Sequence, residues 1–244
     1  APIETITEGI RYDRPGEAPT PVEVPARARL PEGPTTSIAG EWLALAGHPG
    51  VASREYLFRH YDSEVQAGTI LRPGEADAGV TAPLPGCRRA VAISCDGNPL
   101  LGEADPWQAG ARAVLEACRN VVCVGGEPAA ITDCLNYGNP EQPHTMWQFT
   151  EGVRGIGEAC RALGRLSAPQ EPLPVISGNV SFYNQSASGR TVAPSPIVAC
   201  VGVVDDYRRS RSQHLKAPGD RLYLVGEPGA ETGSSLYLRS EERR

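Results

Sequence analysis

The sequence predicts an α/β fold. Apolar runs of strand length alternate along the chain with segments in which apolar residues recur every three or four positions, the spacing of a helix that buries one face. Polar clusters follow several of the predicted strands, and ligands of α/β proteins collect at strand ends. The 27 glycines and 23 prolines among 244 residues indicate long loops between these elements.

The first 36 residues are rich in proline and lack hydrophobic periodicity. Such a segment cannot bury enough surface to offset its ordering entropy, so residues 1–36 are predicted to be a linker or an extended wrapping segment. The compact unit is expected to begin with Ser37, whose hydroxyl is suited to cap a short helix through Leu45. A second short helix is predicted from Ser53 to His60, with Ser53 as its cap.

The central region alternates strands and helices. A strand is predicted over residues 89–94. A helix should then begin at Asp105-Pro106, because an N-cap carboxylate followed by proline in the first turn is a typical helix start. Its apolar face continues to Val122, and Gly125-Gly126 is expected to end it. Residues 128–135 have the composition of a second strand.

The strongest helical pattern runs from Thr145 to Leu163, where the apolar residues form one face that we assign to the core. Two further strands are predicted over residues 174–179 and 197–204. Leu222 to Val225 resembles the opening strand of a second domain that has too few residues to close. The predicted division is therefore a linker (1–36), one α/β domain (37–207) and the start of another (208–244).

Charge, cysteine usage and hydropathy exclude several classes of protein. A net charge of −6 argues against a nucleic-acid partner, because phosphate backbones are bound by clustered Lys and Arg. The seven cysteines show no paired spacing typical of a zinc site or disulfide framework, which favours reduced thiols and a cytoplasmic location. The sequence contains neither an apolar run long enough for a membrane helix nor a signal peptide at its start.

Four polar clusters are the candidate ligand-binding segments. In the second, Asp133, Asn136 and Asn139 offer hard oxygen ligands and amide donors suited to a purine, a ribose hydroxyl or magnesium. In the third, Gly178 lets the backbone approach a ligand beside the amide of Asn179. The alternative is that these Asn-Gly and Asp-Gly pairs merely form turns, but their recurrence at successive strand ends counts against it. The clusters occupy residues 94–99, 131–140, 176–184 and 61–66.

Common catalytic motifs are absent from the sequence. It contains no Walker A motif, no Gly-x-Gly-x-x-Gly that opens a helix after a strand, and no Gly-x-Ser-x-Gly nucleophile elbow. The four histidines are scattered and pair with no obvious nucleophile. We therefore assign no catalytic residue to this chain.

Five runs resemble the phosphoribosylformylglycinamidine synthase family: YDSEVQAGT (61–69), CDGNP (95–99), ITDCLNYGNP (131–140), MWQFTEGVRGIGEACRALG (146–164) and ISGNVSFYN (176–184). The resemblance covers roughly residues 38–238. It implies the N-terminal domain fold of aminoimidazole ribonucleotide synthetase, with a mixed sheet and packed helices. Family members carry two tandem copies of this unit, and the chain is similar to the second copy and the start of its partner domain.

The resemblance also implies an activity and roles for single residues. The activity is that of an ATP-dependent carbon–nitrogen ligase, which converts formylglycinamide ribonucleotide to formylglycinamidine ribonucleotide with ammonia from a glutaminase subunit or domain. Asp133 and Gly178 match positions that contact ATP, and Asn179 matches a ligand of Mg²⁺. Ser181 matches a contact to the formylglycinamide ribonucleotide substrate.

Departures from the family pattern lead us to expect a chain that is inactive alone. The catalytic histidines of the family lie in the first copy, whereas CDGNP at 95–99 has none. Asn120 stands where the first copy has a metal-binding aspartate, and an amide brings no charge to magnesium. Two alternatives stay open: a non-catalytic scaffold copy that holds a structural nucleotide, and another ATP-dependent synthetase or kinase of the same superfamily.

Overall fold

The described residues of the computed structural model fold around one mixed sheet. The structure describes residues 3, 7, 9, 12–20, 37–227 and 233–237. The strands follow the order β1-β2-β3-β6-β4-β5, with β4 and β5 parallel and the other neighbours antiparallel. Their bounds are β1 Thr69–Leu71, β2 Gly79–Thr81, β3 Ala90–Asp96, β4 Glu127–Asn136, β5 Val175–Ser181 and β6 Ser195–Val204. The predicted α/β class and mixed sheet are confirmed.

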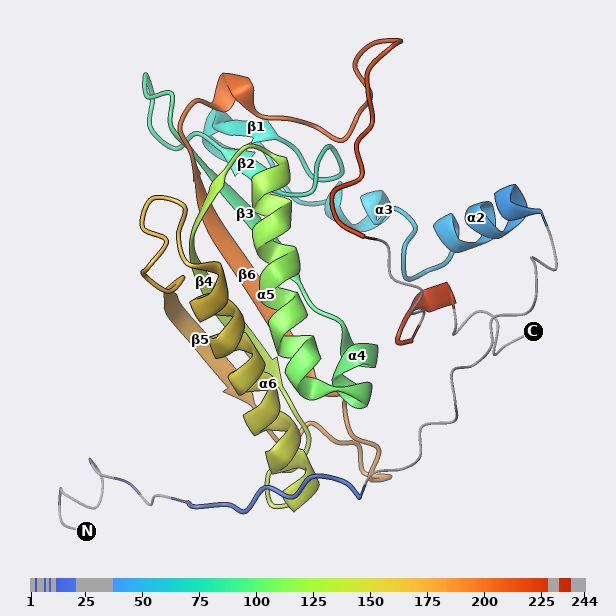
Figure 1. Cartoon of the computed structure of the whole chain (residues 1–244), viewed down its shortest axis with the longest axis vertical. Helices are drawn as coiled ribbons and strands as arrows, with labels where there is room; N and C mark the ends of the chain where they lie inside the picture. The colour runs from blue at the N-terminus through green and yellow to red at the C-terminus, as the bar shows by residue number, and fades with distance from the viewer. Residues whose placement is uncertain are drawn as a thin grey trace.

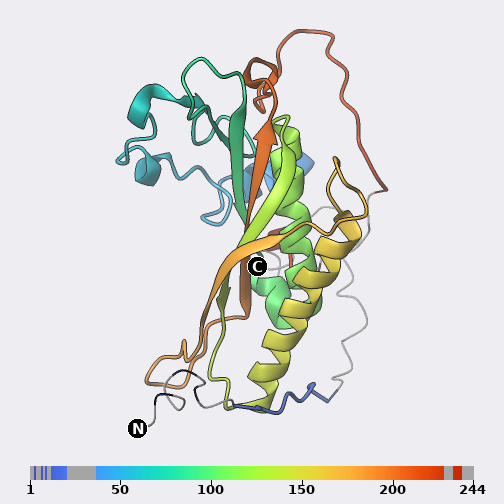
Figure 2. The same ribbon diagram turned by 90° about the vertical axis from the view of Figure 1, so that its left-hand side faces the viewer.

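Two long helices lie side by side on one face of the sheet (Figure 1, Figure 2). The first, α5 (Pro106–Cys123), begins as predicted: the Asp105 carboxylate accepts a hydrogen bond from the Gln108 amide at 2.9 Å. The second, α6 (Pro143–Leu163), starts two residues before the predicted Thr145, again with proline in its first turn. The shorter helices are α2 Ile38–Ala46, α3 Glu55–Phe58 and α4 Pro99–Ala104, with 3-10 turns at Val65–Ala67 and Tyr207–Arg209.

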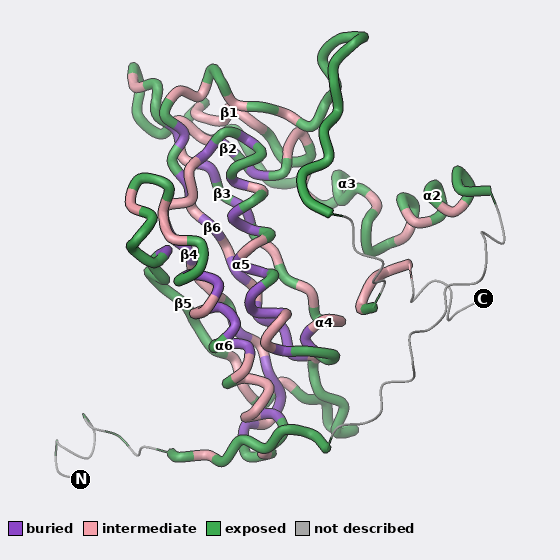
Figure 3. The backbone as a smooth tube through the Cα atoms, viewed as in Figure 1, coloured by how far each residue is buried: buried purple, intermediate pink, exposed green. Residues whose placement is uncertain are grey.

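The hydrophobic core lies between the sheet and these two helices, and Figure 3 shows buried segments along both helices and along the strands behind them. Val114 and Val121 of α5 and Val198 of β6 are fully buried there. Because strand side chains alternate between faces, every second residue of β3, β6 and β4 contributes to this layer. Burying a large apolar side chain of this layer, such as Val198, contributes roughly 1.5–3 kcal/mol relative to leaving it exposed.

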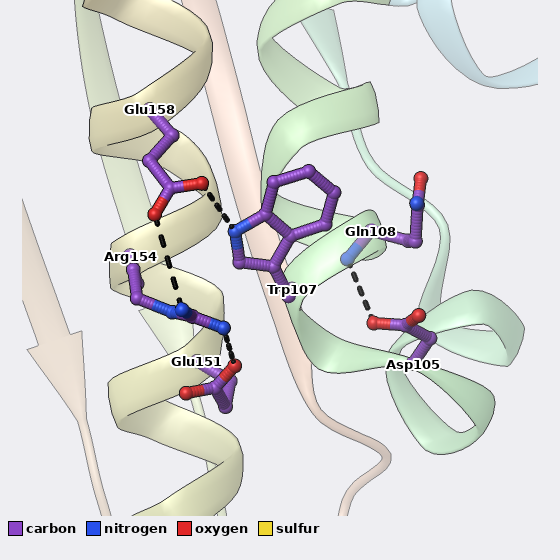
Figure 4. A network of polar contacts seen from close by, with 6 residues as sticks. All are labelled: Asp105, Trp107, Gln108, Glu151, Arg154 and Glu158. Atoms are coloured by element: carbon purple, nitrogen blue, oxygen red, sulfur yellow. Dashed lines mark hydrogen bonds and ion pairs between the residues drawn. The ribbon is translucent and has the colours of Figure 1, made fainter.

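Glycines allow α5 and α6 to approach closely. A Cβ atom on Gly155 would lie 2.1 Å from the carbonyl oxygen of Trp107, and one on Gly110 would lie 2.2 Å from that of Gly152. The Trp107 indole then donates a hydrogen bond across the interface to Glu158 at 3.0 Å. Figure 4 shows Arg154 beside this contact, bridging the carboxylates of Glu151 and Glu158.

The opposite face of the sheet presents apolar side chains to solvent. Val91, Ile93 and Cys95 of β3 point to this face, and their register partners on β6 are Val203, Val201 and Ala199. Ile93 is 48% exposed and Val203 is 42% exposed. One layer of helices therefore covers only one side of an otherwise apolar sheet.

The structure corrects several sequence predictions. The helix predicted over Ser53–His60 is only Glu55–Phe58, and the Ser53 hydroxyl accepts from the Glu55 amide just before it. The strand predicted at Leu222–Val225 is wrong: these residues form no regular structure and are at least 78% exposed. A strand forms only where its backbone groups have partners, and none of the described residues pairs with this segment. Strands β1 and β2 and helix α4 were not predicted.

The N-terminal segment passes the start of α6. The Glu17 amide donates a hydrogen bond to the Pro143 carbonyl at 3.1 Å, and Gly16 lies against the backbone of Trp147. Within the predicted linker, residues 1, 2, 4–6, 8, 10, 11 and 21–36 lie outside the described residues, as do 228–232 and 238–244 of the predicted second domain. The domain limits at 36/37 and 207/208 stay predictions. None of the helices in the described parts of the chain is long and apolar enough to cross a membrane.

Candidate functional site

Three of the predicted polar clusters lie at the same end of the sheet, where β3, β4 and β5 finish. Strands β3 and β4 each run antiparallel to β6, and β5 runs parallel to β4, so β3, β4 and β5 point the same way. One row of register partners crosses all four strands, from Asp96 through Val198 and Asp133 to Gly178. The clusters are thus adjacent in space, as their positions at strand ends predicted. Asp133 and Gly178 lie within β4 and β5, as the strands predicted over residues 128–135 and 174–179 imply.

Asp133 and Gly178 are direct neighbours. A Cβ atom on Gly178 would lie only 2.4 Å from one Asp133 carboxylate oxygen, so the absence of a side chain makes room for this carboxylate. Asp133 lies between Ile131 and Leu135 on the helix-covered face, because these alternate residues belong to the core. Burial raises the pKa of the Asp133 carboxyl. Within the described residues this carboxylate accepts no hydrogen bond, and its oxygens are available to a ligand.

Asn179 and Ser181 lie on the opposite face of the sheet. Their register partners are Cys134 and Asn136, which alternate with Asp133 along β4. Asn179 is exposed and Ser181 is half-buried. The four predicted site residues therefore do not line one pocket. Because β5 is the edge strand, a ligand could contact both pairs only by passing around its free edge.

Ser181 is held by a residue to which the sequence analysis gave no role. Its hydroxyl donates a hydrogen bond to Asn184 Oδ1 at 3.1 Å. Asn184 Nδ2 in turn donates to the carbonyl of Tyr137 at 3.0 Å and to that of Ser181 at 2.8 Å. Asn184 thus ties the loop after β5 to the loop after β4. Its place in the ISGNVSFYN run is the only sequence signal that could have drawn attention to it.

The CDGNP segment also forms ordered contacts. Asn120 Nδ2 of α5 lies 3.0 and 3.1 Å from the two carboxylate oxygens of Asp96 and donates to both. Burial, followed by the nearby charge of Glu116, raises the pKa of Asp96. Asn98 caps α4, accepting hydrogen bonds from the amides of Leu100 and Leu101. The pair that departs from the family pattern, Asp96 and Asn120, is therefore a contacting pair in space.

The donor set does not make a magnesium site by itself. Mg²⁺ is held in proteins by one or two carboxylates together with ligand phosphates. Asn179 offers one neutral amide oxygen. The carboxylate among the predicted site residues, that of Asp133, points to the other face of the sheet. The described residues contain no group of three or more His, Cys, Asp or Glu placed to bind a metal ion. The described residues therefore supply no complete magnesium site.

The fold is a two-layer α/β domain with polar residues at the carboxyl ends of β3, β4 and β5, the position at which ligands of α/β proteins collect. The family model described as "AIR synthase related protein, N-terminal domain" matches residues 75–204, more than half of the chain. The chain belongs to this family.

Named relatives and solved structures agree with this assignment. A "Phosphoribosylformylglycinamidine synthase subunit PurL" of Methanothrix thermoacetophila is 45% identical over 238 residues, 98% of this chain and 30% of its own length. The structure "T. maritima PurL complexed with ADP" matches with a TM-score of 0.55 at 26% identity, covering 80% of this chain and 28% of that one. "T. maritima PurL complexed with FGAR" gives a TM-score of 0.52 at 27% identity, with 64% and 24% covered. The chain spans about 30% of the length of its curated relatives.

Proposed function

We propose that the chain is a nucleotide-binding part of a phosphoribosylformylglycinamidine synthase. The enzyme would use ATP and glutamine-derived ammonia to convert formylglycinamide ribonucleotide to formylglycinamidine ribonucleotide in purine biosynthesis. The observation that carries the proposal is the contact of Asp133 with Gly178, because both residues match ATP-contacting positions and lie together in the structure. The relative with 45% identity and the ADP complex of a protein with the same fold support it.

In this reaction ATP would phosphorylate the amide oxygen of the substrate, and ammonia would then displace phosphate from the same carbon. Asp133 would accept hydrogen bonds from the nucleotide, since its carboxylate has no partner among the described residues. Gly178 would keep the backbone open beside it. Asn179 would supply one ligand to a magnesium ion whose other ligands come from nucleotide phosphates and from outside this chain.

The chain supplies only part of this machinery. It contributes no catalytic base, because Asp96 and Asn120 occupy the place where the first copy should hold its histidines and aspartate. The apolar face around Ile93 and Val203 is suited to pack against the first copy, since an uncovered apolar sheet is stabilised by burial. We therefore propose that the chain is inactive alone and works with the first copy and a glutaminase subunit or domain, in the cytoplasm.

One observation favours a second candidate, a scaffold copy that holds a nucleotide structurally. Asp133 and Asn179 lie on opposite faces of the sheet, so one nucleotide–magnesium complex reaches both only around the edge of β5. In a scaffold, the nucleotide would stabilise this edge without taking part in turnover.

Replacing Asp133 with alanine in the complete synthetase separates the two candidates. A large fall in turnover with unchanged thermal stability supports a role in the reaction. Normal turnover per folded molecule with lowered stability supports the scaffold. Asp205→Ala is the matched control, because the Asp205 side chain is 88% exposed and lies apart from the site.

A further inference from the structure

The side-chain amide of Asn184 can adopt only one orientation. Its nitrogen lies 3.0 Å from the carbonyl oxygen of Tyr137 and 2.8 Å from that of Ser181. The flipped amide would place Oδ1 against both carbonyl oxygens, where acceptors repel one another. Both amide hydrogens are therefore committed to backbone carbonyls, and Oδ1 is the atom that faces the Ser181 hydroxyl at 3.1 Å.

This orientation decides what Ser181 can do. An amide oxygen only accepts hydrogen bonds, so the single hydroxyl proton of Ser181 must be donated to Asn184. The Ser181 oxygen keeps its lone pairs and has no second proton to give. Toward any ligand, Ser181 is an acceptor.

We propose that Asn184 is a positioning residue that fixes Ser181 as a hydrogen-bond acceptor, so that Ser181 binds a hydroxyl or an amide N–H of the substrate and not its phosphate. The inference rests on the proposed function for the contact between Ser181 and the ribonucleotide substrate. Phosphate oxygens at neutral pH are acceptors and would face the lone pairs of Ser181 without a proton between them. The ribose hydroxyls and amide N–H groups of the substrate are the donors that fit.

The backbone around Ser181 preserves this arrangement. The Tyr183 amide donates to the Gly138 carbonyl at 2.8 Å, which holds the loops after β4 and β5 together. Tyr183 adopts a left-handed conformation with φ of 59°, and its hydroxyl donates to Glu141 at 3.1 Å. Asn184 is therefore held on both sides, and the Ser181 proton is committed before a ligand arrives.

The test is a set of cycles between protein and ligand, measured by calorimetry on the complete synthetase. The protein is wild type or Ser181→Ala. The ligands are formylglycinamide ribonucleotide, analogues that each lack one donor (2′-deoxy, 3′-deoxy and N-methyl amide), and an analogue without phosphate. We expect Ser181→Ala to weaken binding of the full substrate about three- to tenfold, the equivalent of one hydrogen bond. With one of the donor-lacking analogues the same substitution should change affinity by less than about twofold, because the shared hydrogen bond is already absent.

Asn184→Ala tests the positioning role. It should reduce the preference for the full substrate over the analogue with which Ser181→Ala no longer changes affinity. The affinity for ADP should stay at the wild-type value. A merely structural role would weaken all ligands together. Ser186→Ala is the control, because Ser186 lies in the adjacent exposed turn and bonds to Ser188 and Arg190.

The outcomes separate the inference from the proposed function. If Ser181→Ala leaves affinity unchanged only for the phosphate-free analogue, Ser181 donates to phosphate. The inference is then overturned, while the substrate contact stands. If Ser181→Ala leaves affinity for the full substrate unchanged, both the inference and the assigned contact fail. If the wild-type synthetase does not bind the substrate, the proposed function itself fails.

Discussion

Gly155→Ala tests the close contact between α5 and α6. A methyl group at this position would lie 2.1 Å from the Trp107 carbonyl oxygen, and the atom that it meets is backbone, which cannot rotate away. The matched control is Gly157→Ala on the same helix, where the new methyl would meet only the mobile end of Arg161 at 3.4 Å. Both substitutions gain helix propensity of roughly 1 kcal/mol. Only Gly155→Ala also incurs overpacking, which costs about 1–3 kcal/mol.

Because the propensity gain is common to both variants, the difference between their stabilities isolates the helix contact. One kcal/mol corresponds to about 2–4 °C in a domain of this size, so Gly155→Ala should melt about 2–12 °C below Gly157→Ala. The assay is thermal unfolding followed by circular dichroism. Equal upward shifts of Tm in both variants would refute the close approach of the helices.

Three further substitutions or modifications have defined outcomes. Burial raises the pKa of Asp133, so the folded state holds this proton more tightly and stability should fall as pH rises from about 4 through the raised value. Asp133→Asn should remove that slope, and an unchanged slope of Tm against pH would contradict the assignment. Tyr137→Phe should leave the free energy of unfolding unchanged or raise it by up to about 1–3 kcal/mol, because the buried hydroxyl has no partner among the described residues. A clear loss in denaturant unfolding would reveal a partner. A thiol reagent should modify the exposed cysteines of the native protein and spare the buried ones until unfolding, and burial also raises the pKa of Cys160 to about 11. The exposed cysteines are Cys95, Cys123 and Cys134, and the buried ones are Cys118, Cys160 and Cys200. Modification of the buried cysteines in the native state would contradict their place in the hydrophobic core.

Sequence patterns predicted the elements whose signals are local. α5 begins where Asp105 and Pro106 indicate, because a capping carboxylate and a proline act within one turn. α6 follows from its regular apolar face. Strand β6 was found over eight of its residues because a buried strand reads as a continuous apolar run.

The missed elements depend on contacts between distant residues. Strands β1 and β2 are three residues long and owe their conformation to pairing with each other and with β3. Leu222–Val225 has the composition of a strand, yet no described strand lies beside it. Local composition cannot tell which of these segments finds a partner.

At the candidate site, too, local motifs were predictable and contacts between distant residues were not. Sequence motifs identified Asp133, Gly178, Asn179 and Ser181, and the register of β4 and β5 brings Asp133 beside Gly178. The strand period then places Asn179 and Ser181 on the other face. The strand predicted over residues 174–179 included Asn179, whereas the placement of Ser181 depends on β5 extending to that residue. Asn184 was missed because its role lies in three hydrogen bonds that span two loops.

We propose that this chain holds half of a composite nucleotide site. Calorimetric titration with Mg-ATP tests it most directly, first on the chain alone and then with the first-copy region of the synthetase added. We predict weak or undetectable binding by the chain alone and clear binding after the addition. Tight binding of Mg-ATP by the chain alone would contradict it.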